Sequence, residues 1–106
     1  MARTLIHAPK TARPGEIIEL RATIAHPMET GLRSDDQGRP VPRNILTHFE
    51  CHYNGQRVFG ALLYAAVAAN PYLAFHLRAQ ASGTITLTWH GDFGFKQTES
   101  LALQVA

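Results

Sequence analysis

The chain has 106 residues, 45% of them hydrophobic, which suits one folded domain spanning residues 1–106. Ten Lys and Arg residues against eight Asp and Glu residues give a formal charge of +2, and the arginines are scattered, which argues against binding to nucleic acid. The single cysteine, Cys51, excludes an intrachain disulfide, and the longest apolar run, 61–69, has about half the length of a membrane span. The N-terminal segment, MARTLIHAPK, lacks an apolar stretch of signal-peptide length, so we expect no export signal and no membrane segment.

Apolar and polar residues alternate with a period of two along most of the chain, which predicts β-strands with one buried face. The segments that show this pattern are 4–7, 16–25, 47–53, 57–62, 73–79, 84–89 and 101–105, and 4–7 and 57–62 show it most weakly. Turn residues separate them, and Asn54-Gly55 is the strongest hairpin signal because both residues tolerate positive φ. About seven short strands predict an all-β fold, an antiparallel sandwich with Phe75 and Trp89 in its core.

Two connections are unusual for a minimal sandwich. Residues 26–43 contain three prolines and a polar tip, and loops of this length are usually functional or disordered. The prolines restrict the residues before them and stiffen both ends of the loop. Residues 64–71 are apolar for a connection and could hold one helical turn; either their own sheet or a partner protein must cover them.

Cys51 and the histidines are the candidate reactive groups. Cys51 alternates with Phe49 and Tyr53, so we expect a buried, structural thiol, with a redox or nucleophilic role as the less favoured interpretation. His48, Glu50 and His52 share the outward face of one predicted strand, and His76 could approach from a neighbouring strand. The two histidines of that strand lie about 13 Å apart, too far to share one metal ion, which favours a solvated strand face. No catalytic motif, phosphate loop or paired-carboxylate motif is present.

Three sequence stretches carry a resemblance to a known family. They are HPMETGLR at 26–33, RPVPR at 39–43 and ANPYLAF at 69–75, with matching residues between and around them. In order and spacing the chain resembles the SoxZ family along essentially its whole length. The stretch HGDFGFKQ at 90–97 departs from the more acidic turn that is common in the family, which puts any role of that turn in doubt.

The resemblance implies an immunoglobulin-like β-sandwich without catalytic residues, cofactor or metal. It implies a subunit of the SoxYZ sulfur-carrier complex of thiosulfate oxidation, in which SoxY is the heterodimer partner and carries sulfur on a cysteine. Transient contacts with other Sox enzymes and a periplasmic location, reached by export together with SoxY, are implied as well. Two alternatives stay open: a metal-binding (Fe, Cu or Zn) redox domain on a sandwich, and a generic adhesion or scaffold sandwich.

We place the partner contacts on the long loop and the apolar connection. Apolar and aromatic side chains in loops are the residues that dominate binding energy at interfaces. The residues predicted to bind the partner are Met28, Leu32, Val41, Tyr64, Val67 and Tyr72.

Overall fold

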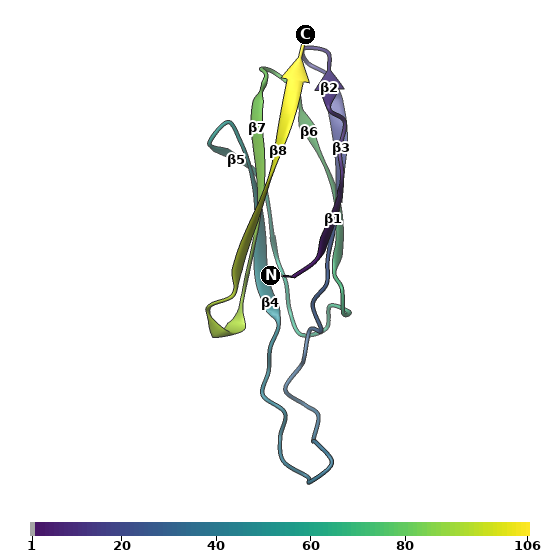
Figure 1. The fold of residues 1–106 in the computed structure, drawn as a ribbon, viewed down its shortest axis with the longest axis vertical. Helices are drawn as coiled ribbons and strands as arrows, with labels where there is room; N and C mark the ends of the chain where they lie inside the picture. Colours follow the sequence, from purple (N-terminus) through teal and green to yellow (C-terminus); the bar gives the residue numbers. More distant parts are fainter. Residues whose placement is uncertain (1) are drawn as a thin grey trace.

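All seven predicted segments form strands in the computed structural model, which describes residues 2–106 (Figure 1). The strands are β1 (Thr4–His7), β2 (Thr11–Ala12), β3 (Ile17–Ile24), β4 (Leu46–Tyr53), β5 (Gln56–Leu62), β6 (Tyr72–Arg78), β7 (Gly83–Gly91) and β8 (Lys96–Val105). The pattern of alternation does not predict the eighth strand, β2, because two residues are too few to show it. This strand pairs parallel with β8, whereas the sequence predicted antiparallel pairing throughout the sandwich.

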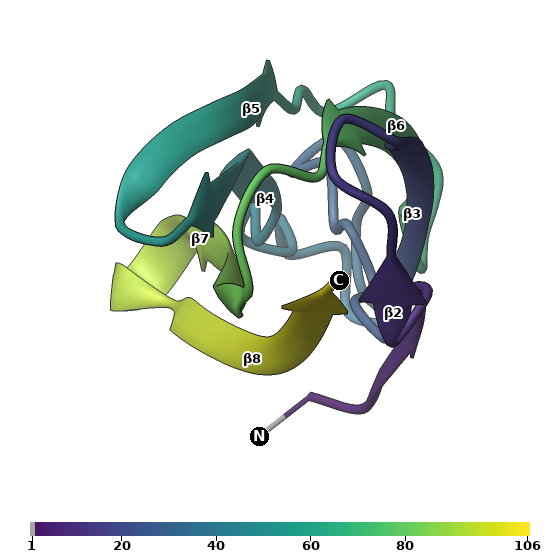
Figure 2. The ribbon, with the colours of Figure 1, turned by 90° about the horizontal axis from the view of Figure 1, so that it is seen from above.

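The strands form two sheets that face each other across the core (Figure 2). The smaller sheet has the order β1-β3-β6, and the larger has the order β2-β8-β7-β4-β5. Each sheet buries the apolar side of the predicted alternation and leaves the other side to solvent. The molecule is elongated, 59 Å long and 20 Å in both other directions.

Aromatic side chains from both sheets fill the core. Trp89 and Phe75 are 1% and 4% exposed, which confirms their predicted burial. Phe49 lies between them, with ring centroids 5.1 Å from Trp89 and 5.7 Å from Phe75. Phe59 of β5 stacks on Phe75 of β6 at 4.4 Å and so joins the two sheets along one side. Burial of each such side chain contributes roughly 1.5–3 kcal/mol.

The hairpin between β4 and β5 has the predicted turn. Asn54 and Gly55 adopt φ of 50° and 82°, the left-handed values that this turn needs. The Asn54 side-chain oxygen accepts the Thr84 N–H at 3.0 Å, which ties the turn to the start of β7.

The apolar connection 63–71 contains no helix, so the suggested helical turn is wrong. A single turn forms instead, in which the Val67 N–H donates to the Tyr64 carbonyl at 2.9 Å. Leu63 is buried, and Ala65 and Val67 pack partly on the core, so the sandwich itself covers half of this connection. None of the elements in residues 2–106 is a helix with the length and apolarity that a membrane crossing requires.

Candidate functional site

Three connections meet at one end of the sandwich, which we call the loop end (Figure 1). It consists of the long loop 26–45, the connection 63–71 and the β7–β8 turn 91–94, which contains the 3₁₀ turn Asp92–Gly94. Backbone hydrogen bonds join the three: Asn70 N–H donates to His26, and Asp92 N–H donates to Ile45. Connections far apart in the sequence therefore form one surface.

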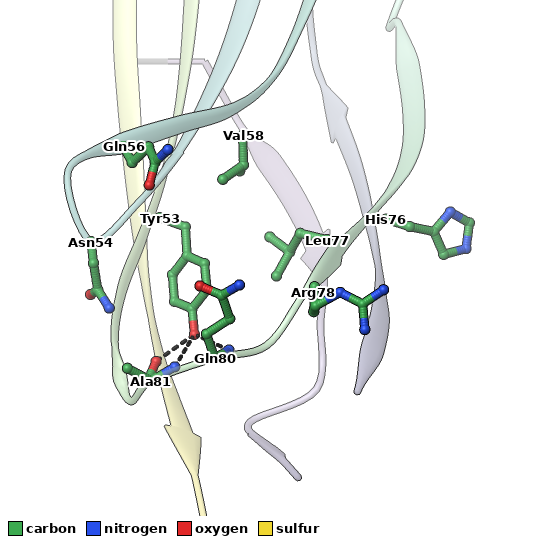
Figure 3. Close-up of a pocket in the computed structure, with 9 residues that line it drawn as sticks. All are labelled: Tyr53, Asn54, Gln56, Val58, His76, Leu77, Arg78, Gln80 and Ala81. Atoms are coloured by element: carbon green, nitrogen blue, oxygen red, sulfur yellow. Dashed lines mark hydrogen bonds between the residues drawn. The ribbon is translucent and has the colours of Figure 1, made fainter. Parts of the chain in front are cut away.

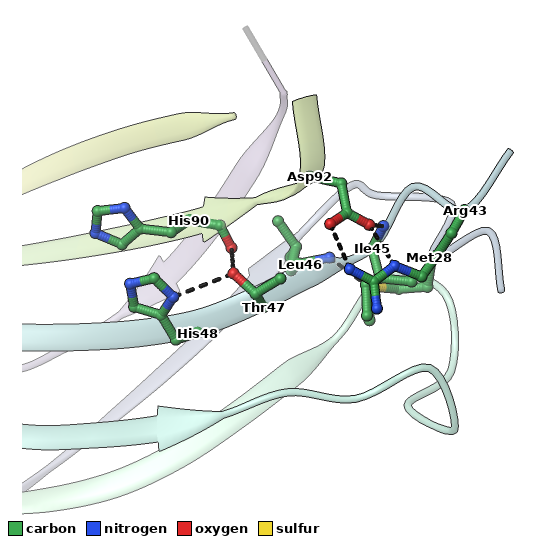
Figure 4. A network of polar contacts seen from close by, with 8 residues as sticks. All are labelled: Met28, Arg43, Ile45, Leu46, Thr47, His48, His90 and Asp92. Atoms are coloured by element: carbon green, nitrogen blue, oxygen red, sulfur yellow. Dashed lines mark hydrogen bonds and ion pairs between the residues drawn. The ribbon is translucent and has the colours of Figure 1, made fainter. Parts of the chain in front are cut away.

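Asp92 fixes the long loop to the β7–β8 turn (Figure 4). Its two carboxylate oxygens accept hydrogen bonds from the Arg43 Nε at 2.9 Å and Nη2 at 2.7 Å, a bidentate arrangement that is strong and directional. The same carboxylate accepts the Ile45 N–H at 3.0 Å. The Arg43 guanidinium, followed by the Ile45 N–H, holds the pKa of Asp92 below its usual value. A Cβ at Gly91 would lie 2.8 Å from the Ile45 carbonyl, so the close approach requires glycine.

His26 and Met28 fix the other side of the loop base. The buried His26 Nδ1 accepts the Met28 N–H at 3.0 Å, and Met28 Sδ accepts the Leu46 N–H at 3.3 Å. Burial lowers the pKa of His26, and the Asp92 charge opposes this effect. Because Nδ1 can accept only when it carries no proton, this contact requires the neutral imidazole.

Polar contacts order the rest of the loop, which has little core of its own. Glu29 and Asn44 exchange two backbone hydrogen bonds at 2.8 Å, and the Val41 N–H donates to the Arg33 carbonyl at 2.9 Å. The Asp35 carboxylate closes the tip by accepting the backbone N–H of Arg39 and of Gln37, both at 2.9 Å. These two bonds, together with one from the Arg39 side chain, lower the pKa of Asp35. The loop thus forms a hairpin-like arm.

Large apolar side chains project from the loop end into solvent. Leu32 on the arm is 91% exposed, Tyr64 on the connection is 64% exposed, and Tyr72 at the start of β6 is 59% exposed. Val41 and Val67 are half-buried. Five of the six residues predicted from sequence to bind a partner therefore lie at the loop end and are at least partly exposed, although the chain between Leu32 and Tyr72 runs through β4 and β5.

The sixth residue, Met28, is only 4% exposed and belongs to the core. Its φ of 51° and its bond to Leu46 turn the side chain inward, so it is not available to a partner and we remove it from the proposed surface. Sequence reasoning also missed Phe93, which is 78% exposed with φ of 59°. The signal was an aromatic residue inside a Gly-Asp-Phe-Gly turn, a position that folding alone does not favour.

Cys51 lies on β4, the strand between β5 and β7, and its side chain is fully buried in the core, which confirms the expected position. Burial raises the pKa of its thiol to about 11. A reactive thiol needs an exposed, electropositive setting that stabilises the thiolate, and this environment has the opposite effect.

Histidines of the strands lie on both outer faces of the sandwich, whereas His26 is buried in the loop base. His48 stacks on His90 of β7 with ring centroids 4.1 Å apart, and the Glu50 carboxylate lies 3.5 Å from the His90 Nε2. His76 does not make the approach to these residues that the sequence left open, because β6 belongs to the other sheet, where His76 lies 3.6 Å from Glu19. Within residues 2–106, no group of three His, Cys, Asp or Glu side chains is placed to hold a metal ion.

A pocket of about 460 Å³ opens beside the Asn54-Gly55 turn (Figure 3). The Tyr53 hydroxyl reaches into it, where it accepts the N–H of Gln80 and of Ala81, both at 3.1 Å, and donates to the Ala81 carbonyl. These three bonds occupy the donor and both acceptor positions of the hydroxyl and fix the β6–β7 connection. The role of the Tyr53 hydroxyl in this pocket is therefore structural.

The sequence comparison assigns the chain to a family. The model of the sulphur oxidation protein SoxZ matches residues 6–102. The chain belongs to the SoxZ family. This confirms the family resemblance, and the SoxZ-family chain accordingly has a role in the sulfur-oxidation (Sox) system. Among curated proteins, the search found no match.

Solved structures share the fold of this SoxZ-family chain. The superoxide reductase (neelaredoxin) from Ignicoccus hospitalis has a TM-score of 0.76 at 14% identity, covering 99% of this chain and 82% of that one. The sulfur carrier protein SoxY from Chlorobium limicola f thiosulfatophilum has a TM-score of 0.67 at 12% identity, covering 96% and 74%. At these identities the likeness shows the fold alone, and it agrees with the predicted immunoglobulin-like sandwich.

Proposed function

We propose that this chain is the non-catalytic subunit of a SoxYZ-type sulfur-carrier complex and that it binds SoxY through the loop end. The match of the SoxZ family over residues 6–102 carries the proposal. SoxY bears the sulfur intermediates on its cysteine, and this chain helps to present them to other Sox enzymes in the periplasm, which it reaches by export with SoxY.

The geometry of the loop end supports this assignment. Leu32, Tyr64, Tyr72 and Phe93 are exposed apolar side chains on segments held by backbone and ionic hydrogen bonds. A surface that is already ordered loses little conformational entropy on binding. Aromatic anchors on such a surface supply most of the energy at protein interfaces.

The thiol of this chain supports a presenting role. A sulfur carrier needs a thiolate that several enzymes can reach, whereas Cys51 is fully buried and burial raises its pKa to about 11. We therefore expect Cys51→Ser to leave thiosulfate turnover by the reconstituted system largely intact. Loss of turnover with an intact heterodimer would contradict this role.

Binding of SoxY to single alanine variants tests the interface. We expect Leu32→Ala, Tyr64→Ala or Phe93→Ala to weaken SoxY binding by more than about 1 kcal/mol in calorimetric titrations, the usual threshold of an important interface residue. Ile17→Ala is the matched control, because Ile17 is 53% exposed but lies at the start of β3, at the opposite end of the sandwich. The placement is wrong if no loop-end variant crosses that threshold, or if the control weakens binding equally.

A further inference from the structure

A cleft runs along the side of the sandwich where β1 and β8 face each other without pairing. The N-terminal segment starts in the smaller sheet as β1 and crosses to the larger sheet as β2 (Figures 1 and 2). The cleft between this segment and β8 has a volume of about 550 Å³. Ile6, Ala8, Leu101 and Leu103 form its apolar lining, and Lys10 is the charged residue among the lining side chains.

Backbone groups of β8 face this cleft without a strand partner. The Gln104 N–H donates to the Lys10 carbonyl at 3.0 Å and the Ala106 N–H to the Ala12 carbonyl at 3.1 Å, so even-numbered residues of β8 face β2. Successive peptide groups of a strand point to opposite sides, so the N–H and C=O of Ser100 and Ala102 face the cleft. Within residues 2–106, no strand pairs with β8 at these two residues on that side.

The opposite wall carries a second row of such groups. The Ala25 N–H donates to the Arg3 carbonyl at 2.8 Å, so the odd-numbered residues of the N-terminal segment pair with β3. The backbone groups of Thr4 and Ile6 therefore point the other way, toward β8. Two half-open strand edges thus face each other across an apolar floor.

The chain fills both ends of the cleft with peptide-like groups. At one end β2 pairs with β8 as a short parallel strand. At the other end the Gln97 side-chain amide accepts the Ala2 N–H at 2.9 Å and donates to the Ala2 carbonyl at 2.8 Å. This pair of bonds has the pattern of a residue on a neighbouring strand. Between the two ends, the Thr4 hydroxyl donates to the Glu99 carboxylate at 2.9 Å across the cleft. Beyond this contact, the edge of β8 at Ser100 and Ala102 has no strand partner within residues 2–106.

We propose that this cleft is an acceptor site for an extended peptide strand of another protein. The inserted segment bonds the backbone of Ser100 and Ala102, and its alternate apolar side chains pack on Ile6 and Leu101. Leu101 points inward yet is only half-buried, so the incoming side chains cover core surface that the chain leaves open. In strand addition, main-chain bonds give affinity and side-chain pockets give specificity. A single strand fits better than the sheet edge of a second copy, because the N-terminal segment forms the other wall of the cleft and a whole sheet cannot enter between it and β8. The site does not rest on the loop-end interface.

Titration of the labelled protein with a blocked peptide of about four residues, alternating valine and alanine, tests the site by NMR. This length matches the open stretch of β8 between the Glu99 and Gln104 contacts, at ~3.4 Å per residue. We expect saturable shifts of the Ile6, Ser100 and Ala102 amides and slower hydrogen exchange at Ser100 and Ala102. A peptide N-methylated at every second residue, on the edge that faces β8, should bind at least about fivefold more weakly, because it lacks donors.

Two variants test the backbone contact from the protein side. Ala102→Pro removes the N–H that faces the cleft and spares the bonds to β7, which come from the neighbouring residues. We expect it to weaken peptide binding at least about fivefold, whereas Ala102→Val, which keeps the N–H, should not. If Ala102→Pro unfolds, the N-methylated peptide decides the question on the unmodified chain.

Four results would overturn the proposal. They are the absence of a saturable shift at millimolar peptide, equal binding of both peptides, shifts confined to another surface, and a concentration-dependent dimer whose contacts protect Ser100 and Ala102 without peptide. The last result would identify a second copy of this chain as the occupant.

Discussion

The sandwich core and the long arm of the loop end obtain their order from different interactions. Around Trp89 and Phe49, order comes from apolar burial between two sheets, which is strong and weakly directional. In the arm, order comes from backbone pairs such as Glu29 with Asn44 and from the Arg43–Asp92 contact. Because the arm does not use apolar burial for its shape, it can leave Leu32 exposed. The difference shows how a small domain can expose apolar side chains on a surface that is nevertheless ordered.

The largest effect that separates the two regions should come from the core. Trp89→Ala removes a side chain that is 1% exposed and leaves a cavity, so we expect the free energy of unfolding to fall by about 3–5 kcal/mol. Chemical denaturation measures the loss. A loss below about 1 kcal/mol would contradict the central role of this residue.

Met28 joins the two regions and should have the next largest effect. Met28→Ala removes both a buried side chain and the acceptor of the Leu46 N–H, so we expect a loss of about 2 kcal/mol or more in unfolding free energy. Met28→Leu keeps the volume and removes only the sulfur acceptor, so its loss should be smaller. Equal losses for the two variants would show that the hydrogen bond, not the packing, matters at this position.

Acidification should weaken the base of the arm before it affects the core. Burial lowers the pKa of His26, so its contribution to stability is complete above its ordinary pKa of 6.5 and is lost as the pH falls through the lowered value. The Asp92 carboxylate, whose pKa lies below its ordinary value of 3.8, contributes above that value and loses its contribution at lower pH. Both changes act in the same direction, and thermal unfolding as a function of pH measures them.

His26→Asn is the matched variant for this titration. Its side-chain oxygen can occupy the acceptor position of Nδ1 but takes up no proton. We therefore expect its stability to depend less on pH below 6.5 than that of the unmodified chain. An unchanged pH profile would show that His26 does not control the base of the arm.

The smallest effect on stability should come from the exposed arm residue. Leu32→Ala truncates a side chain that is 91% exposed, so we expect the free energy of unfolding to change by less than about 0.5 kcal/mol. Thermal and chemical unfolding measure this. A larger loss would mean that Leu32 supports the fold of the arm and would make its binding role harder to separate from stability.

The sequence by itself determined all the strands of residues 2–106 except β2, together with their buried faces. A period of two assigns each side chain to one face of a sheet, so the pattern alone places Phe75, Trp89 and Cys51 in the core. The Asn54-Gly55 turn was equally predictable because few residue pairs accept two left-handed φ values. The SoxZ family could be recognised from motifs in the long loop and at the start of β6.

Only the tertiary structure decided which connections share one end and which loop residues turn inward. Met28 and Leu32 look alike in the sequence, yet the His26 and Leu46 contacts bury the first and leave the second in solvent. The unpaired edge at Ser100 and Ala102 depends on pairing between distant segments. Local periodicity carries no information on such long-range contacts, because they are set by how the two sheets and their connections pack together.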